Sequence, residues 1–489
     1  MGDPDKDVGQ TPAAERTGGE KVVLKRTLGL ASCISFIIGI VIGTGIFVSP
    51  KGVLRGVNGS VGWAMILWTL CGLISMTGAL CYVELITSYT KSGGEFTFLL
   101  DAFGPVVAFL RMWTLLFLIG PSANAVQSLT VANYLTVPFF GCDEVPPPQS
   151  AVVLIAICVL FLIFFVNCIS VKWTARLQVF FTVAKVLGLI ILIITGLVFI
   201  FKGHVSNLQN AFEDTDISIK GVPLAIYSGI FAYSGWDYIS SMTEEVKKPE
   251  KTIPISVMIS MSTVIVIYLL ANIGYFSLLT PQEVLSSDAV GADFGVRALG
   301  NWSWLIWLFV ALSAAGNLNG AVFGRTRTFF VAAREGLLPE FLSMIHINHL
   351  TPIPAIAISL PFSILFILVG DALVLIEYLT FIDWFFSALT IAIIPYYRWK
   401  YKDMRRPFKI PLPFAIIFII FTLFIMVMTF YAKPLYSLVG VLATLAGIPV
   451  YYLCVWWNNK PQWMINATLK VNLLFQKFFF AIRQEEKTY

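Results

Sequence analysis

The chain has 489 residues, of which 57% are hydrophobic and only 12% are charged. Soluble domains carry about 25% charged residues, so a water-soluble fold could not hide this much apolar surface. The formal net charge of +5 is spread over separate polar segments, which excludes the concentrated basic surface of a nucleic-acid-binding protein.

Apolar segments long enough to cross a bilayer recur along the chain. A membrane-spanning helix needs about 20 mostly apolar residues. By this criterion the sequence predicts twelve spans, at 28–56, 60–86, 106–138, 150–170, 176–202, 220–247, 255–280, 302–322, 353–370, 373–397, 411–431 and 435–457. The apolar runs are continuous rather than alternating, which disfavours a β-barrel, and only helices then satisfy the backbone in lipid. The predicted fold class is an all-α polytopic membrane protein.

Polar segments flank the predicted spans at both ends. Residues 1–27 are polar and poor in aromatic residues, which predicts a disordered tail. Residues 458–489 mix large apolar residues with lysines, a pattern that fits either an amphipathic helix on the membrane surface or a helix packed beneath the transmembrane core. With twelve spans both termini share the side that holds most lysines and arginines, so the positive-inside rule predicts that both are cytoplasmic.

The first and sixth spans both contain residues that interrupt helices. The first reads GIVIGTGIFVSP, with Gly43 and Gly45 in its middle, and the sixth reads YSGIFAYSGWDY, with Ser234 and Gly235. Interrupted segments at matching positions of two halves point to a site near the middle of the membrane in transporters built from inverted repeats. Close helix packing would explain either motif alone. The pairing of the two motifs favours a binding site.

Four segments carry a resemblance to a known family. They read GIVIGTGIFVSPKGVL, TKSGGEFTFLLDAFGP, FAYSGWDYISSMTEEVKKPEKTIP and FVAAREGLLP. Over nearly its whole length the chain resembles the light subunits of heteromeric amino-acid transporters, in the L-type branch of the amino acid–polyamine–organocation superfamily. The resemblance implies a LeuT-like 5+5 inverted repeat with broken helices 1 and 6. Residues 28–202 would form the first repeat, residues 220–397 the second, and residues 411–457 two additional helices.

The two interrupted spans offer groups that suit the ends of an amino acid. Unwinding the first span at Gly43, Thr44 and Gly45 exposes N–H groups at the positive end of a helix, which suits a carboxylate. Carbonyl groups freed by the two breaks can accept the hydrogens of the substrate ammonium group. These carbonyls are expected to be those of Val41, Phe231 and Ser234. The resemblance also implies that the ring of Phe231 closes over the substrate as a gate, with ordinary helix packing as the alternative.

Lys185 lies deep in the fifth span, within FFTVAKVLGLIILII. An ionisable residue so deep in an apolar span is costly and is by default a functional hypothesis. The resemblance places Lys185 where sodium-coupled relatives hold a cation. Its ammonium group would then tie the fifth span to the unwound first span in place of sodium, and sodium independence would follow. Snorkelling to the membrane surface is the alternative.

Two acidic residues lie near the expected pocket. Asp237 follows the break in the sixth span, and Asp383 lies in FIDWFF of the tenth. The resemblance matters here because some relatives with anionic substrates carry arginines at the positions that match Asp383 and Asn133. An unpaired carboxylate would repel acidic side chains, so neutral and aromatic substrates are expected, with cationic ones as a further option. Pairing of both acids with Lys185 or with backbone groups is an open alternative. Weaker candidates for the pocket are Trp236, Asn124 and Ser122, for each of which packing or hydrogen bonding between helices is an equally good explanation.

One cysteine stands apart from the other six. Cys142 lies in a predicted outward-facing loop, FFGCDEVPPPQS, whereas the others lie in apolar spans. A lone thiol on the oxidising side fits either an intermolecular disulfide or a free thiol. The resemblance implies that Cys142 joins a single-span glycoprotein heavy subunit that escorts the light subunit to the plasma membrane.

Together the residues and the resemblance predict a sodium-independent amino-acid exchanger that works by alternating access. No enzyme motif, metal-ligand spacing or cofactor motif occurs in the sequence, so we expect no catalytic residue, no metal and no cofactor. The expected partners are amino-acid substrates, the heavy subunit and membrane lipids, with no nucleic acid. A transporter-like sensor or receptor that binds amino acids without moving them is the alternative.

Overall fold

The computed structural model describes residues 28–89, 93–140, 148–209, 211–212, 221–287, 289–369, 372–432, 434–457 and 459–483. These residues are almost entirely helical, with one two-stranded sheet. Eight of the described helices are long and apolar enough to cross a membrane, and a ninth span results if one bent pair is counted as one. The all-α membrane class is confirmed. The count of twelve spans remains a prediction, and the tail 1–27 and Cys142 lie outside the described residues.

The first half of the chain folds into long helices joined by short ones. In chain order they are α1 (Leu30–Val41), α2 (Gly45–Gly56), α3 (Val61–Ser88), α4 (Glu95–Phe103), α5 (Pro105–Thr114), the π-helix η1 (Leu115–Ile119), α6 (Gly120–Phe140), α7 (Gln149–Ile169), α8 (Val171–Phe201) and α9 (Ser206–Gln209). The first predicted span is thus divided into α1 and α2, whose axes differ by 46°. The third predicted span is one continuous stretch through α5, η1 and α6.

The second half begins with another interrupted helix. Its elements are α10 (Gly221–Ala232), the 3-10 helix η2 (Trp236–Glu245), α11 (Pro249–Leu278), α12 (Pro281–Ser286), α13 (Val290–Leu299), the 3-10 helix η3 (Gly300–Trp302), α14 (Trp304–Arg334), η4 (Glu340–Ser343), β1 (Met344–His346), α15 (Ile353–Ala357), α16 (Ser359–Val369) and α17 (Ala372–Lys400). The predicted sixth span corresponds to α10 and η2 together. The predicted eighth span is longer than expected, because α14 continues to Arg334.

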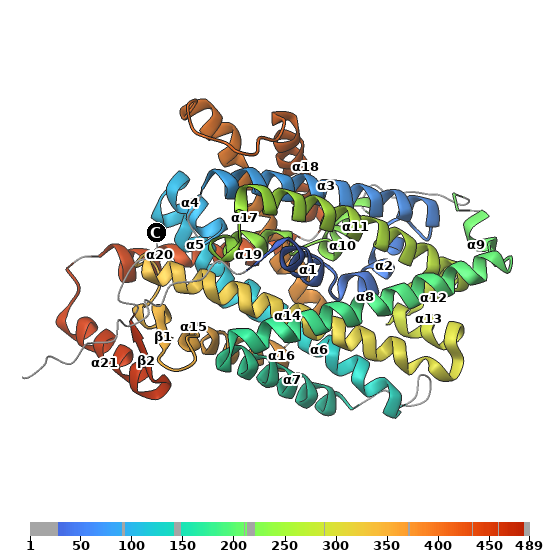
Figure 1. Ribbon diagram of the computed structural model, residues 1–489, viewed down its shortest axis with the longest axis horizontal. Coiled ribbons are helices and arrows are strands. Elements are labelled where there is room, and N and C mark those ends of the chain that lie inside the picture. Colours follow the sequence, from blue (N-terminus) through green and yellow to red (C-terminus); the bar gives the residue numbers. More distant parts are fainter. Residues whose placement is uncertain are drawn as a thin grey trace, which may run out of the picture.

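The last elements follow α17 and include a helix outside the main bundle. They are α18 (Leu412–Ala432), α19 (Pro434–Leu445), α20 (Gly447–Tyr451), the π-helix η5 (Tyr452–Trp456), α21 (Gln462–Phe479) and β2 (Ala481–Arg483). Strand β2 pairs antiparallel with β1, and the ring of Phe475 in α21 stacks on Phe341 with centroids 4.1 Å apart. Figure 1 shows α21 at one end of the molecule, beside the two strands. The C-terminal helix is therefore anchored to the segment that follows α14.

The two interrupted helices lie together in the middle of the bundle (Figure 1). Helix α2 packs against α10, whereas α1 packs against α8, α11, α14 and η2. A Cβ atom at Gly45 would lie 2.4 Å from the Cα atom of Ala232, and one at Gly56 would lie 2.5 Å from the carbonyl oxygen of Gly221. Such close contact between backbones requires residues without a side chain. Glycine therefore holds α2 and α10 in direct backbone contact.

Candidate functional site

The first helix is interrupted between Val41 and Gly45. No described residue accepts a hydrogen bond from the backbone N–H groups of Gly43, Thr44 and Gly45. These groups lie at the start of α2, where the helix dipole is positive. A Cβ atom at Gly43 would lie 2.0 Å from the amide nitrogen of Asn317, so α14 closes one side of the break. The break thus presents unused donors in the position that suits an anion.

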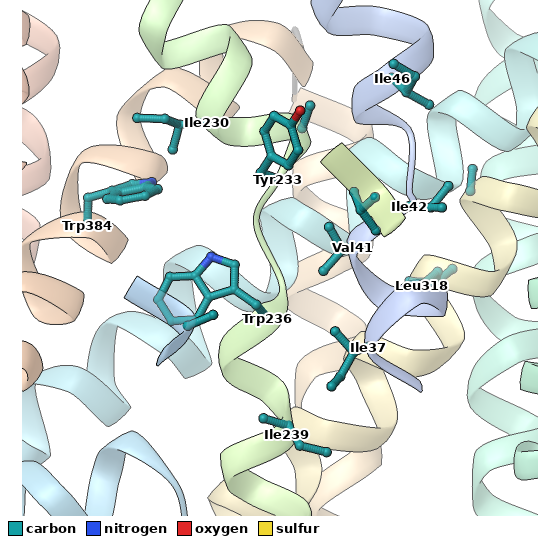
Figure 2. Close-up of a cluster of buried hydrophobic side chains, with 14 of the residues drawn as sticks. Ile37, Val41, Ile42, Ile46, Ile230, Tyr233, Trp236, Ile239, Leu318 and Trp384 are labelled. Carbon is teal, nitrogen blue, oxygen red and sulfur yellow. The ribbon is translucent and has the colours of Figure 1, made fainter. Parts of the chain in front are cut away.

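The sixth helix is interrupted at Tyr233, Ser234 and Gly235. Gly235 has a φ of 108°, a left-handed conformation that favours glycine, and the chain then continues as η2. The carbonyl oxygen of Phe231 accepts hydrogen bonds from the hydroxyl of Ser234 at 2.7 Å and from its N–H at 3.3 Å. Figure 2 shows Tyr233 and Trp236 on this segment, close to Val41 at the end of α1. The two breaks therefore lie side by side, as the inverted-repeat hypothesis requires.

Tyr268 in α11 contacts both interrupted helices. Its hydroxyl lies 3.0 Å from the carbonyl oxygen of Val41 and 3.0 Å from that of Ala232. A hydroxyl has one hydrogen, so it donates to one of these carbonyls at a time. The side chain is fully buried. Tyr268 was not among the predicted site residues, because nothing in an apolar stretch distinguishes a tyrosine that joins two helix ends from one that fills the core.

Lys185 in α8 lies against the end of α1. Its ammonium group donates to the carbonyl oxygens of Gly39 at 2.6 Å and Ile42 at 2.7 Å, and the side chain is only 1% exposed. Among the described residues, no carboxylate forms an ion pair with it. The last carbonyls of a helix carry partial negative charge, which favours a cation there. Lys185 thus joins the fifth predicted span to the interrupted first one, in the geometry that we expected.

A cavity of about 160 Å³ lies at the two breaks. Its lining comes from α1, α2, α10 and η2, together with α4, α5, η1, α6, α14 and α17. The predicted site residues that line it are Val41, Gly43, Thr44, Gly45, Phe231, Ser234, Asp237, Asp383 and Ser122. Trp236 and Asn124 are not among the lining residues. The ring of Trp236 is buried and packs edge-on against Tyr82, with centroids 5.0 Å apart.

An ionic cluster around the buried Arg111 of α5 lines the cavity. The guanidinium of Arg111 donates to Glu95 at 2.7 Å and to Asp383 at 2.8 Å. Glu95 also accepts from the hydroxyl of Thr390 at 3.1 Å. The expectation that Asp383 would be unpaired, or paired with Lys185 or the backbone, is therefore wrong in this structure, because its partner is Arg111. An arginine within an apolar span was the signal that could have indicated this cluster.

Two further charged residues line the same cavity. Asp237 in η2 takes part in no ion pair with any residue that the structure describes. Arg325 in α14 is buried and donates to three neutral acceptors, which are the carbonyls of Ala321 and Gly120 and the side-chain oxygen of Asn124. Arg325 was not among the predicted site residues, because the predicted eighth span ended before it.

A comparison with known protein families identifies the family of the chain. Residues 28–457 match the sequence model of the family described as amino acid permease. The chain belongs to the amino acid permease family. This membership confirms the family resemblance and places the chain among transporters rather than enzymes. An interrupted-helix site in an integral membrane protein fits this permease family.

Three permease relatives match over nearly their whole length. The chain is 43% identical to the Homo sapiens cystine/glutamate transporter over 473 residues, which are 97% of this chain and 94% of the relative. It is 41% identical to the Rattus norvegicus large neutral amino acids transporter small subunit 2, over 99% of this chain and 91% of the relative. It is 39% identical to the Mus musculus Asc-type amino acid transporter 1, over 95% of this chain and 87% of the relative.

Proposed function

We propose that the protein is a sodium-independent exchanger of L-amino acids that works by alternating access. The observation that carries this proposal is the cavity at which two interrupted helices meet. Both ends of an amino acid find partners there that do not depend on its side chain. Three permease relatives named as amino-acid transporters support the substrate class.

The substrate carboxylate binds the N–H groups of Gly43, Thr44 and Gly45, which have no acceptor among the described residues. The ammonium group binds carbonyl oxygens at the breaks. A carbonyl oxygen has two lone pairs, and among the described residues that of Val41 accepts only the hydroxyl of Tyr268, so it can accept a second hydrogen bond. The carbonyl of Phe231 accepts from both the hydroxyl and the N–H of Ser234, so the ammonium group would replace the longer of these two bonds, the one from the N–H at 3.3 Å. The carbonyl of Ser234 completes the set.

Lys185 takes the place of a transported cation. Its ammonium group supplies a fixed positive charge to the carbonyls at the end of α1. A sodium ion would do the same with oxygen ligands, but it would have to bind and leave in every cycle. Because the lysine is covalently fixed, uptake needs no sodium gradient. The proposal that one amino acid is exchanged for another rests on the family and not on Lys185.

Neutral and aromatic amino acids are the proposed main substrates, and cationic ones are a further option. Phe231 lines the cavity and forms the gate. The pairing of Asp383 with Arg111 leaves Asp237 as the carboxylate that can interact with a substrate side chain. The electrostatic argument against acidic substrates therefore rests on Asp237 alone.

We also propose that the protein works in the plasma membrane with a heavy subunit. The word subunit in the name of one relative supports an assembly of this kind. Cys142, between α6 and α7, is the proposed site of the disulfide to a single-span glycoprotein. The distribution of lysine and arginine supports cytoplasmic termini.

Proteoliposomes that contain the purified full-length chain test the transport proposal. Preloading them with leucine should accelerate uptake of labelled leucine, and replacing sodium with choline should leave uptake unchanged. Binding of leucine without uptake would support the sensor alternative. Uptake that needs sodium would contradict the role proposed for Lys185.

A further inference from the structure

Arg325 differs from the other buried arginine of the cavity in what surrounds its charge. Its Nε donates to the carbonyl of Ala321 at 3.1 Å, Nη1 to the carbonyl of Gly120 at 2.5 Å, and Nη2 to Asn124 Oδ1 at 2.7 Å. Its side chain is 4% exposed. No carboxylate of the described chain lies within ion-pair distance of its guanidinium. The charge of Arg325 is therefore hydrogen-bonded but not balanced.

A buried guanidinium without a counter-ion is costly inside a membrane protein. Arg111 shows the usual solution, because Glu95 and Asp383 both pair with it. Arg325 lines the same cavity and has neutral acceptors only. A cation that faces a cavity and has no counter-ion indicates that an anion from outside the chain binds there and balances its charge.

The position of Arg325 along α14 shows which part of a substrate it could reach. Asn317, Ala321, Arg325 and Thr328 all line the cavity, and their spacing places them on one face of the helix. Asn317 lies against Gly43, where the head group would bind. Arg325 is two turns further on, about 12 Å along the helix axis. Its side chain leans back toward Ala321, one turn before it. The guanidinium still lies about one turn further along α14 than Asn317, on the side where a substrate side chain would extend.

We propose that Arg325 allows a further class of substrate, besides neutral and aromatic amino acids, by binding a carboxylate at the far end of the substrate side chain. This inference rests on the proposed function, because the head group must lie between the two breaks. A guanidinium has five N–H donors, and the three hydrogen bonds described above leave one N–H on each terminal nitrogen. Two such groups can bind a carboxylate in a bidentate manner. Glycine at position 120 leaves room for the guanidinium, because a Cβ atom there would lie 3.1 Å from Arg325 Nη1.

Two kinds of amino acid carry such a carboxylate. An acidic amino acid ends in one, and a disulfide-linked dimer such as cystine ends in a second head group with both a carboxylate and an ammonium group. Asp237 also lines the cavity, and its carboxylate distinguishes an acidic side chain from the second head group of a dimer. Its charge repels an acidic side chain but attracts the second ammonium group of a dimer.

Competition against labelled leucine in proteoliposomes tests the proposal with matched pairs of compounds. Glutamate is compared with glutamine, and cystine with the mixed disulfide of cysteine and cysteamine, which lacks only the far carboxylate. In the wild-type protein, at least one carboxylate-bearing compound should compete about tenfold better than its partner. Arg325→Gln should abolish that preference. Each matched pair is compared within one variant, so a change in leucine uptake itself does not enter the comparison. Arg405→Gln, at an exposed position on the surface, is the control and should preserve the preference.

The outcomes distinguish an acidic ligand from a dimer, and they distinguish failure of the role of Arg325 from failure of the proposed function. Asp237→Asn should improve glutamate competition if the natural ligand is acidic, and weaken cystine competition if it is a dimer. If leucine is exchanged but neither far carboxylate improves competition, the role of Arg325 is overturned and the proposed function stands. If leucine is not exchanged at all, the proposed function itself fails. Should Arg325→Gln not reach the membrane, the wild-type comparison of the matched pairs still decides.

Discussion

The guanidinium of Arg111 lies 2.8 Å from a carboxylate oxygen of Asp383 and joins α5 to α17 at the wall of the cavity. Glu95 binds the same guanidinium at 2.7 Å, so two acids share one buried base. Without the guanidinium, the negative charges of the two carboxylates would repel each other inside the protein, where the dielectric constant is low. This cluster fixes the relative positions of three segments around the proposed substrate site.

Replacing Arg111 by glutamine should therefore destabilise the protein strongly. Removing one partner of a buried ion pair costs about 3–5 kcal/mol, because the remaining charges are left without compensation. The thermal unfolding temperature of the detergent-solubilised protein is the measurement. Arg405→Gln, which removes an exposed pair with Glu250, should cost at most about 1 kcal/mol. Equal effects of the two substitutions would contradict the structural role of Arg111.

Replacing Lys185 by methionine should reduce uptake at least about tenfold. Methionine is apolar and cannot donate, so the carbonyls of Gly39 and Ile42 would lose their donor and the end of α1 its connection to α8. Initial rates of leucine uptake into preloaded proteoliposomes measure the effect. Normal rates in the variant, at the same amount of reconstituted protein, would show that this connection is dispensable.

Replacing Tyr268 by phenylalanine should slow exchange and cost about 1–3 kcal/mol of stability. The substitution removes only the hydroxyl that serves the carbonyls of Val41 and Ala232. The matched control is Tyr275→Phe in the same helix, because the Tyr275 hydroxyl is buried without a hydrogen-bond partner among the described residues. Unfolding temperature and uptake should both distinguish the two variants. A larger loss for Tyr275→Phe would contradict the interpretation.

Replacing Gly45 by alanine should abolish uptake. The new Cβ atom would lie 2.4 Å from the backbone of Ala232, so α2 and α10 would have to separate. Gly29→Ala is the control, because a Cβ atom at that position meets no atom within 4 Å. Comparing uptake at equal surface amounts separates a damaged site from poor expression. Full activity of Gly45→Ala would show that the backbone contact is not needed.

Glu283, outside the membrane-spanning segments, should make stability depend on acidity. Hydrogen bonds from the backbone N–H of Thr280 and from Arg297 lower the pKa of this carboxyl below its ordinary value of 4.5. A lowered pKa means that the folded state favours the charged form, so the stabilisation is present above pH 4.5 and is lost as the pH falls below it. Unfolding temperatures of the wild type and Glu283→Gln should differ at pH 7 and converge at low pH. A constant difference would count against this linkage.

The sequence was sufficient to predict the helical class and both helix breaks. A helix break rich in glycine can be predicted from the local sequence, because few other residues tolerate the backbone conformations and close contacts of such a break. For Lys185 the sequence alone indicated only that a lysine deep in an apolar segment is costly and needs acceptors. Its approach to the first span was predicted from the family resemblance, and the structure shows the two carbonyls that it reaches.

Contacts between distant segments could not be predicted in the same way. The pairing of Asp383 with Arg111 depends on how α17 packs near α5, and neither segment specifies its neighbour. The contribution of Arg325 depended on where the eighth span ended, which hydropathy does not define well for a helix with several arginines near its end. Cys142 and residues 1–27 lie outside the described residues, so the predictions for them remain untested.

The glycine contacts between α2 and α10 have a mechanical consequence. Gly45 lies against Ala232 and Gly56 lies against Gly221, so the backbones of these two half-helices touch near both ends of α2. We expect α2 and α10 to move together as one rigid body. The bending during a transport cycle should then concentrate in the short unwound segments next to it, which are the same segments that hold the solute.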